Sequence, residues 1–272
     1  MTYISFVLTR KCNLRCGHCY IEGGPEHANT TISEENFKRI IDHLPNKRIN
    51  LVLTGGEVFT IKDKLFNFLT YIKSINKDRK EKNQIDVTVQ TNAYWAKNEK
   101  MMESNLSDLS SLGVKSLDVT SDDPNHFEEG IDPDSLKRLD ETLFSSEFFD
   151  DYIIRGVSLT ESVPLGRAKG KIPEKCNRHL KCIYAIKSGS ITIREDGKVY
   201  PCCYSIFPIK GNLIEQPLTK ILKQSRRDKR LAALNRGGIK KLALVDGYSK
   251  KNLEKLISEY DECGFCMKYY ST

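Results

Sequence analysis

Along its first 160 residues the chain alternates short apolar runs with longer segments whose apolar residues recur at helical spacing. Such alternation predicts parallel strands joined by crossover helices. The five strand-like runs are fewer than the eight of a closed barrel, so the sequence predicts an incomplete one. The runs are residues 3–8, 49–53, 85–90, 115–119 and 152–159, and the helical segments are residues 34–44, 62–75, 98–112 and 134–144.

Three cysteines follow the first strand-like run at a C-x3-C-x2-C spacing, as Cys12, Cys16 and Cys19. A cluster of four irons is usually held by four cysteine thiolates. A triad therefore leaves one iron open, and an open iron can bind and cleave a cofactor. A zinc site, which usually shows paired C-x2-C or Cys/His knuckles, and inert or disulfide-bonded cysteines are the alternatives.

Composition supports an ordinary globular protein of one or two domains, with 272 residues, 39% hydrophobic and 29% charged. No apolar stretch is long enough to span a bilayer, and the N-terminal run is too short for a signal peptide. Nine cysteines without a secretion signal favour a reducing cytoplasm and metal ligation over disulfides. We therefore expect a cytoplasmic protein that does not bind membranes.

The net charge of +7 is concentrated in part at residues 220–236 and 240–241. Such a stretch is either a solvated helix face or a contact for an anionic or acidic peptide partner. We find no nucleic-acid binding motif and no regular interleaving of basic and aromatic residues. The sequence therefore predicts no nucleic-acid partner.

The second part of the chain is rich in cysteine and begins after a Pro- and Gly-rich break at residues 164–170. Residues 190–194 and 198–201 flank an Asp-Gly pair, which predicts a β-hairpin. Helical patterns follow at residues 218–234 and 250–259. Four ligands from two segments can close a complete iron–sulfur or zinc site. The cysteines here are Cys176, Cys182, Cys202, Cys203, Cys263 and Cys266.

The cysteine triad within residues 8–20, together with a Gly-Gly-Glu turn after the second strand, resembles the corresponding motifs of the radical S-adenosylmethionine (SAM) enzymes. The resemblance implies a 4Fe–4S cluster on the triad, with SAM chelated by the open iron. It also implies a partial barrel, which has six strands in this family. Since only five strand-like runs are visible here, we expect a shortened version. His18 departs from the family, which usually has an aromatic residue there. The turn expected to bind the SAM amino group comprises Gly55, Gly56 and Glu57.

The same resemblance implies further cofactor contacts at the carboxyl ends of the strands. They are Tyr20 after the triad, Asn92 in a Thr-Asn-Ala version of the family's Thr-Asn-Gly, and Ser121 with Asp122 after the fourth strand. Loop caps or Asx-turns are the alternative roles for the last two. Arg155 interrupts an apolar strand and is the candidate catalytic residue, as a carboxylate-binding guanidinium or as a structurally paired arginine.

The cysteine-rich part resembles the SPASM extension of radical SAM enzymes and its shorter form, twitch, in residues 164–168 and 211–213. A full SPASM extension carries about seven cysteines, so the count favours one auxiliary 4Fe–4S cluster. The expected ligands are Cys182, Cys202, Cys263 and Cys266, with Cys203 able to replace Cys202 and Cys176 a ligand or a free thiol.

These resemblances imply a shortened partial (β/α) barrel of about five to six parallel strands at residues 1–163. A linker at residues 164–181 and a small twitch-like domain with a β-hairpin and helices at residues 182–272 would follow. The layout is similar to that of the butirosin-pathway aminocyclitol dehydrogenase.

The implied activity is reductive cleavage of SAM to a 5′-deoxyadenosyl radical and hydrogen abstraction, with the auxiliary cluster accepting an electron in a net oxidation. The favoured substrate is a ribosomally made peptide, and the alternative is a small polyol, sugar or aminocyclitol. A non-catalytic iron–sulfur or zinc protein is the third possibility. Expected partners are an electron donor such as flavodoxin or ferredoxin and a separate leader-peptide recognition protein.

Overall fold

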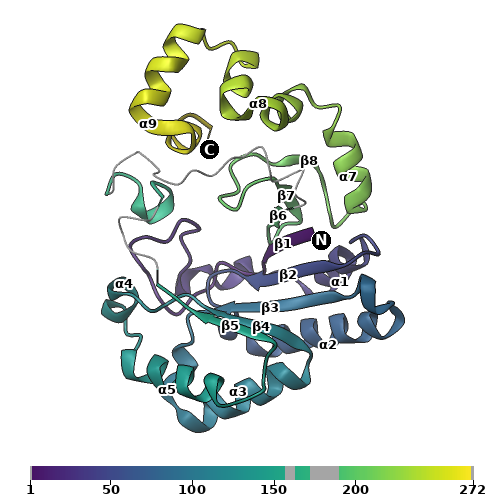
Figure 1. Ribbon diagram of the computed structural model, residues 1–272, viewed down its shortest axis with the longest axis vertical. Coiled ribbons are helices and arrows are strands. Elements are labelled where there is room, and N and C mark those ends of the chain that lie inside the picture. The colour runs from purple at the N-terminus through teal and green to yellow at the C-terminus, as the bar shows by residue number, and fades with distance from the viewer. Residues whose placement is uncertain (1, 157–162, 172–189, 271–272) are drawn as a thin grey trace.

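A computed structural model describes residues 2–156, 163–171 and 190–270 and contains one sheet of eight strands (Figure 1). The strands lie in the order β5-β4-β3-β2-β1-β6-β7-β8. Their bounds are β1 Thr2–Val7, β2 Ile49–Thr54, β3 Ile85–Thr91, β4 Val114–Val119, β5 Asp151–Ile154, β6 Ser190–Ile193, β7 Lys198–Tyr200 and β8 Ile209–Asn212.

The part of the sheet from β5 to β6 is parallel, which confirms the partial barrel of an α/β protein. All five expected strands are present, although the end of the fifth run lies outside the described residues. The sixth parallel strand is β6, which pairs with β1 from Tyr3↔Ser190 to Phe6↔Ile193. The expected hairpin of β6 and β7 is therefore confirmed, and it continues the barrel sheet.

Helices follow the strands as crossover connections, and α2, α3 and α5 lie together on the lower side of the sheet as drawn (Figure 1). The first helix begins where Ser33 accepts a hydrogen bond of 3.2 Å from the Asn36 backbone N–H, as its sequence predicts. The helices of this part are α1 Glu34–Asp42, α2 Lys62–Asp78, α3 Glu99–Ser111, α4 Pro124–Glu128 and α5 Pro133–Phe144.

Of the C-terminal helices, α8 and α9 lie at the top of the view and pack together, whereas α7 packs beside β8 (Figure 1). The single helix expected at residues 218–234 is wrong, because the chain forms α7 Leu218–Ser225 and α8 Lys229–Val245. Asp228 separates them, since its carboxylate caps α8 by accepting from the Arg230 and Leu231 backbone N–H groups at 2.9 and 3.2 Å. The last helix, α9 Lys250–Tyr270, is longer than expected and contains a non-helical residue at Asp261.

In the described part of the chain, no helix combines the length and apolar character that crossing a membrane would require.

Candidate active site

A cavity of about 360 Å³ lies where the parallel strands end. Loops converge at the carboxyl ends of parallel strands, so side chains from distant segments meet there. All three triad cysteines line the cavity, together with five further residues of the sequence prediction: Tyr20, Gly55, Gly56, Asn92 and Arg155. The carboxyl-end location of the predicted site therefore agrees with the fold.

The triad loop already presents its sulfurs as acceptors of main-chain N–H groups. The Leu14 N–H donates to Cys12 Sγ at 3.4 Å, and the Gly23 N–H donates to Cys19 Sγ at 3.3 Å. Burial raises the pKa of the Cys12 and Cys16 thiols to about 12. Buried thiols become thiolates when iron supplies positive charge, and N–H donors to the sulfurs are a usual means of tuning such a cluster.

The donor set of the triad fits a multi-iron cluster better than a single ion. Among the described residues, no three His, Cys, Asp or Glu side chains are grouped closely enough to hold one metal ion. A four-iron cluster instead takes one thiolate at each of several corners. Three soft sulfur ligands around one cavity therefore suit iron–sulfur binding.

Gly55 and Gly56 are required by the close approach of two loops. The Gly56 N–H donates to the Thr9 carbonyl at 2.8 Å. Gly55 has a φ of +158°, and a Cβ on it would lie 2.5 Å from the Thr9 oxygen. A Cβ on Gly56 would overlap the Lys11 carbonyl. Only glycines allow this turn to pack against the triad loop and present its backbone to the cavity.

Glu57 lies beneath this turn and is fully buried. Its carboxylate accepts hydrogen bonds from the Asn92 N–H at 2.6 Å, the Thr91 hydroxyl at 2.8 Å and the Phe59 N–H at 2.9 Å. Burial raises its pKa to about 7, and these three bonds oppose the rise. The carboxylate is not among the groups that line the cavity. The role of Glu57 toward the SAM ammonium therefore stays a prediction, with its carboxylate held just beneath the turn that lines the cavity.

Asn92 and Ser121 lie in successive layers below the cavity. The Asn92 side chain lines it and donates to Asn13 Oδ1 at 3.0 Å. Ser121 is fully buried and donates to the Asn92 carbonyl at 2.8 Å. Asp122 is exposed, and its N–H donates to the Arg155 carbonyl at 3.2 Å. Neither Ser121 nor Asp122 is among the residues that line the cavity, and their contact with SAM stays a prediction.

Arg155 lines the cavity as a paired guanidinium. It donates twice to the Asp118 carboxylate, at 3.0 and 2.8 Å, and this hydrogen bonding raises its pKa. Asp118 also accepts from the Gln90 amide at 2.7 Å, and Gln90 in turn accepts from the Thr54 hydroxyl at 2.5 Å. A polar row therefore crosses four neighbouring strands and fixes the arginine in place.

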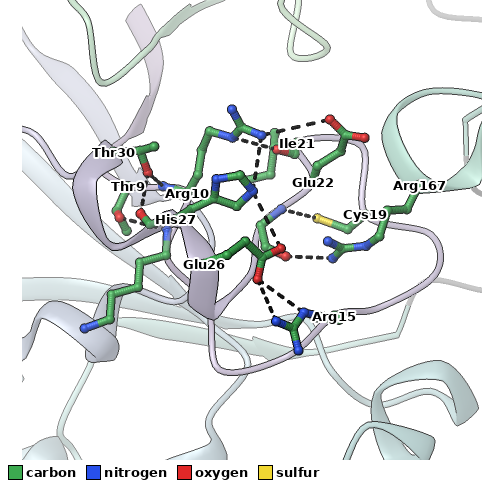
Figure 2. A network of polar contacts seen from close by, with 12 residues as sticks. Thr9, Arg10, Arg15, Cys19, Ile21, Glu22, Glu26, His27, Thr30 and Arg167 are labelled. Carbon is green, nitrogen blue, oxygen red and sulfur yellow. Dashed lines mark hydrogen bonds and ion pairs between the residues drawn. The ribbon is translucent and has the colours of Figure 1, made fainter.

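Arg167 is a residue of this site that sequence reasoning missed (Figure 2). Its Nε donates to the Cys16 carbonyl at 2.9 Å, and its guanidinium also donates to the Gly23 carbonyl at 2.7 Å. Its own N–H donates to the Cys19 carbonyl at 3.2 Å. One arginine thus holds both ends of the triad loop. The only signal was its place in the Pro-Leu-Gly-Arg-Ala stretch.

Two histidines also line the cavity and were not predicted as site residues. The rings of His18 and His126 meet edge to face, with centroids 4.9 Å apart. His126 is 8% exposed, and its Nδ1 lies 2.7 Å from the Asp123 carboxylate. Burial and the neighbouring His126 lower the pKa of His18. His18 therefore occupies the family's aromatic position with a ring-to-ring contact.

The four described cysteines of the C-terminal part lie in two segments, one after β7 and the other in α9. Cys203 lines the triad cavity, whereas Cys202 does not. Cys263 and Cys266 are buried in α9, each 6% exposed. The ring of Phe207 lies 4.9 Å from that of Tyr270, so the segment after Cys203 packs against the end of this helix. Cys176 and Cys182 lie outside the described residues.

Comparison with protein families gives two matches along the chain. The radical SAM superfamily matches residues 6–140. The SPASM family, an iron–sulfur cluster-binding domain, matches residues 182–266. The first contains the triad and the Gly-Gly-Glu turn, and the second contains the four expected auxiliary ligands.

Two curated proteins of Bacillus subtilis (strain 168) are similar to the chain. YydG, whose name assigns it to peptide biosynthesis, is 24% identical over 247 residues, which cover 78% of this chain and 73% of YydG. AlbA, named for biosynthesis of the antilisterial bacteriocin subtilosin, is 47% identical over 58 residues, which cover 21% of this chain and 13% of AlbA.

Two solved structures share the fold at low sequence identity. BtrN in complex with AdoMet and 2-DOIA has a TM-score of 0.56 and 16% identity, covering 87% of this chain and 86% of BtrN. Native anSMEcpe with AdoMet and the Cp18Cys peptide has a TM-score of 0.54 and 14% identity, covering 95% of this chain and 99% of that one.

Proposed function

Because the chain is a radical SAM protein with a SPASM iron–sulfur cluster-binding domain, we propose that it modifies a ribosomally made peptide by hydrogen abstraction. When bound, the cluster and SAM supply a 5′-deoxyadenosyl radical that removes hydrogen from an unactivated C–H. The observation that carries the proposal is the cavity itself, which combines three cysteines, a glycine turn and polar strand ends.

The residues of the cavity have distinct roles in this proposal. Cys12, Cys16 and Cys19 hold the cluster, and the backbone of Gly55 and Gly56 receives the SAM amino group. Glu57 acts from beneath, because its three hydrogen bonds fix the turn against Asn92. A radical needs its target hydrogen held close, so this rigidity serves positioning.

Other residues act on the cofactor or substrate from the rim. Tyr20 packs edge to face against Tyr204, with ring centroids 5.5 Å apart, and both line the cavity. Arg155 uses the guanidinium face that Asp118 leaves open to receive a carboxylate of SAM or substrate. Ser121 and Asp122 support this set through their hydrogen bonds to the Asn92 and Arg155 backbones.

A peptide substrate is favoured over a small molecule by the sequence relatives. YydG is similar over most of its length, and both curated relatives are named for peptide or bacteriocin biosynthesis. The structural likenesses do not separate the two substrate classes, since one neighbour contains a peptide and the other 2-DOIA. A small-molecule dehydrogenase is therefore the alternative outcome of the substrate experiment.

The cysteine-rich part provides for a net two-electron oxidation. Cys182, Cys202, Cys263 and Cys266 hold one auxiliary 4Fe–4S cluster in this proposal. When bound, this cluster would supply an acceptor for one electron of the substrate radical, and loss of one proton to a base would then leave a crosslink or a double bond. The proposed domains are a barrel at residues 1–163, a linker at residues 164–181 and an auxiliary part at residues 182–272. Strand β6 belongs to the auxiliary part and pairs with β1 of the barrel sheet.

Partners complete the proposed cycle. A flavodoxin or ferredoxin delivers the electron that starts SAM cleavage, and a separate protein can present the leader of the precursor peptide. The electron donor follows from the chemistry, since each turnover needs an electron.

The experiment first searches the neighbouring genes for a short open reading frame, and then tests turnover of that peptide with anaerobically reconstituted protein, SAM and dithionite. Mass spectrometry is expected to find a peptide that has lost two hydrogens, together with stoichiometric 5′-deoxyadenosine. Deoxyadenosine formation with an unchanged peptide, and oxidation of a polyol or aminocyclitol under the same conditions, would replace the peptide proposal with the small-molecule one.

A further inference from the structure

The basic charge of the chain is concentrated on α7 and α8. Residues 217–245 contain nine Lys or Arg and one Asp, which gives a net charge of +8, whereas the whole chain carries +7. The rest of the chain is therefore close to neutral. Charge gathered in this way produces a local positive potential that a mixed surface would not have.

Most of these basic side chains are exposed and have no acidic partner among the described residues. Arg230 pairs with Asp246 at 2.9 Å and Lys240 with Glu262 at 3.4 Å. The acid within the stretch, Asp228, is occupied by its cap on α8 and by Lys210 at 3.6 Å. Lys241 is also exposed and has no recorded ion pair, but it follows the non-helical break at Gly237 and Gly238. We name the six residues before this break the basic surface: Lys220, Lys223, Arg226, Arg227, Lys229 and Arg236.

The register of the helices places these residues on outward faces. In α7, Leu218, Ile221 and Ser225 are buried, which leaves Lys220 and Lys223 on the opposite side. Arg227 follows at the same helical spacing just beyond the helix. In α8, Lys229 and Arg236 are two turns apart and therefore share a face. Each of the two helices therefore presents basic side chains to solvent.

The basic surface lies at the other end of the sheet from the cavity. The Leu218 N–H donates to the His43 carbonyl at 3.0 Å, so α7 begins beside the end of α1, just before β2 starts. The cavity lies where the strands end. A partner held here is docked and does not react here.

The chemistry of the surface favours a polypeptide over other anions. Residues 217–245 contain no Phe, Tyr or Trp, so the stretch offers no ring on which a nucleic-acid base could stack. In α7, Leu218 and Ile221 are buried and Leu222 is half-buried, so this helix presents no apolar face to a membrane. An acidic peptide needs neither feature, because its carboxylates pair with spaced lysines and arginines.

We propose that the basic surface binds an acidic segment of the peptide substrate, outside the residues that react. This inference rests on the proposed function, because it assigns a docking site to the same substrate. Holding one segment raises the effective concentration of the reacting segment at the cavity.

The test uses the reconstituted protein and a fluorescein-labelled peptide of alternating glutamate and serine. The same peptide with glutamine in place of glutamate is the uncharged control. The surface variant is Lys220→Glu, Lys223→Glu and Arg227→Glu combined. Its matched control reverses three exposed lysines near the end of α2, as Lys77→Glu, Lys80→Glu and Lys82→Glu, and so changes the net charge equally.

Fluorescence anisotropy is expected to show binding of the glutamate peptide that weakens as salt rises. The surface variant should bind at least about tenfold more weakly, and the control variant should stay within about twofold of the native protein. Equal weakening in both variants, or none in the surface variant, would overturn the proposal. Tighter binding of single-stranded DNA, lost in the surface variant alone, would overturn it in favour of nucleic acid.

Two further readouts separate this proposal from the proposed function. SAM cleavage without peptide should be unchanged in the surface variant, because the altered residues lie away from the cavity. If the native protein oxidises the peptide and the surface variant changes neither peptide binding nor KM, the docking proposal is overturned and the proposed function stands. Surface-dependent binding with no peptide oxidation at all would overturn the function alone.

Discussion

The Nε of Arg167 donates a hydrogen bond of 2.9 Å to the main-chain oxygen of Cys16, a residue 151 positions earlier in the chain. The same guanidinium donates to the Gly23 carbonyl at 2.7 Å, so it bridges the triad loop from Cys16 to its return at Gly23. The segment after the barrel strands thus helps to hold the loop that binds the cluster.

Replacing Arg167 tests both its charge and its geometry. A fixed cation beside a cluster favours the reduced state, so Arg167→Gln should lower the midpoint potential by on the order of tens of millivolts. Arg167→Lys keeps the charge but loses the two-point contact, so it should retain more of the native potential while binding iron less firmly. Redox titration followed by electron paramagnetic resonance, with iron analysis, measures both. Native values in the Gln variant would contradict this role.

Glu57 should make stability depend on pH. Burial raises its pKa from 4.5 to about 7, so between these values the folded protein holds a proton that the unfolded chain has released. The free energy of unfolding should therefore fall as pH rises through this window, by roughly 3 kcal/mol from this group. Urea denaturation at several pH values measures the dependence.

Glu57→Gln is the matched comparison, because the amide cannot ionise. The variant should lack this part of the pH dependence, while every other titrating group contributes as in the native protein. It should also be less stable at low pH, since an amide NH₂ would face one of the N–H donors at Phe59 or Asn92. Parallel pH profiles for the two proteins would show that Glu57 does not carry the proton.

Adjacent cysteines should behave differently when replaced. Cys203 lines the triad cavity and Cys202 does not, so Cys202 is the auxiliary ligand in our proposal. Cys202→Ala should reduce the iron content from about eight to about four per chain, whereas Cys203→Ala should keep about eight. Iron and sulfide analysis after anaerobic reconstitution decides between them. The reverse pattern would exchange the roles of the two residues.

Local sequence signals predicted the parts of the site that depend on neighbours along the chain. The triad, the glycine turn and the alternation of strands and helices are of this kind, and β1 to β4 begin within one residue of their expected positions. Ser33 is also a cap of this kind, because a serine directly before a helical segment is a preferred N-cap.

Contacts between distant segments could not be predicted in this way. The pairing of β6 with β1 joins residues 190–193 to residues 3–6, and nothing in either run specifies the other. The burial of Glu57 depends on Asn92 and Thr91 closing over its carboxylate, and a carboxylate after two glycines carries no sign of that. The recorded hydrogen bonds of the Arg167 side chain to described residues go to main-chain carbonyls, which leave no trace in side-chain identity.

The central claim is that Cys12, Cys16 and Cys19 hold a cluster that cleaves SAM. The most direct measurement is 5′-deoxyadenosine released by anaerobically reconstituted, dithionite-reduced protein given SAM, compared with a Cys16→Ala variant that retains the auxiliary cysteines. We predict release by the native protein and none above background by the variant, which keeps about four irons. Native protein that holds both clusters yet releases no 5′-deoxyadenosine, or equal release by the variant, would contradict the claim.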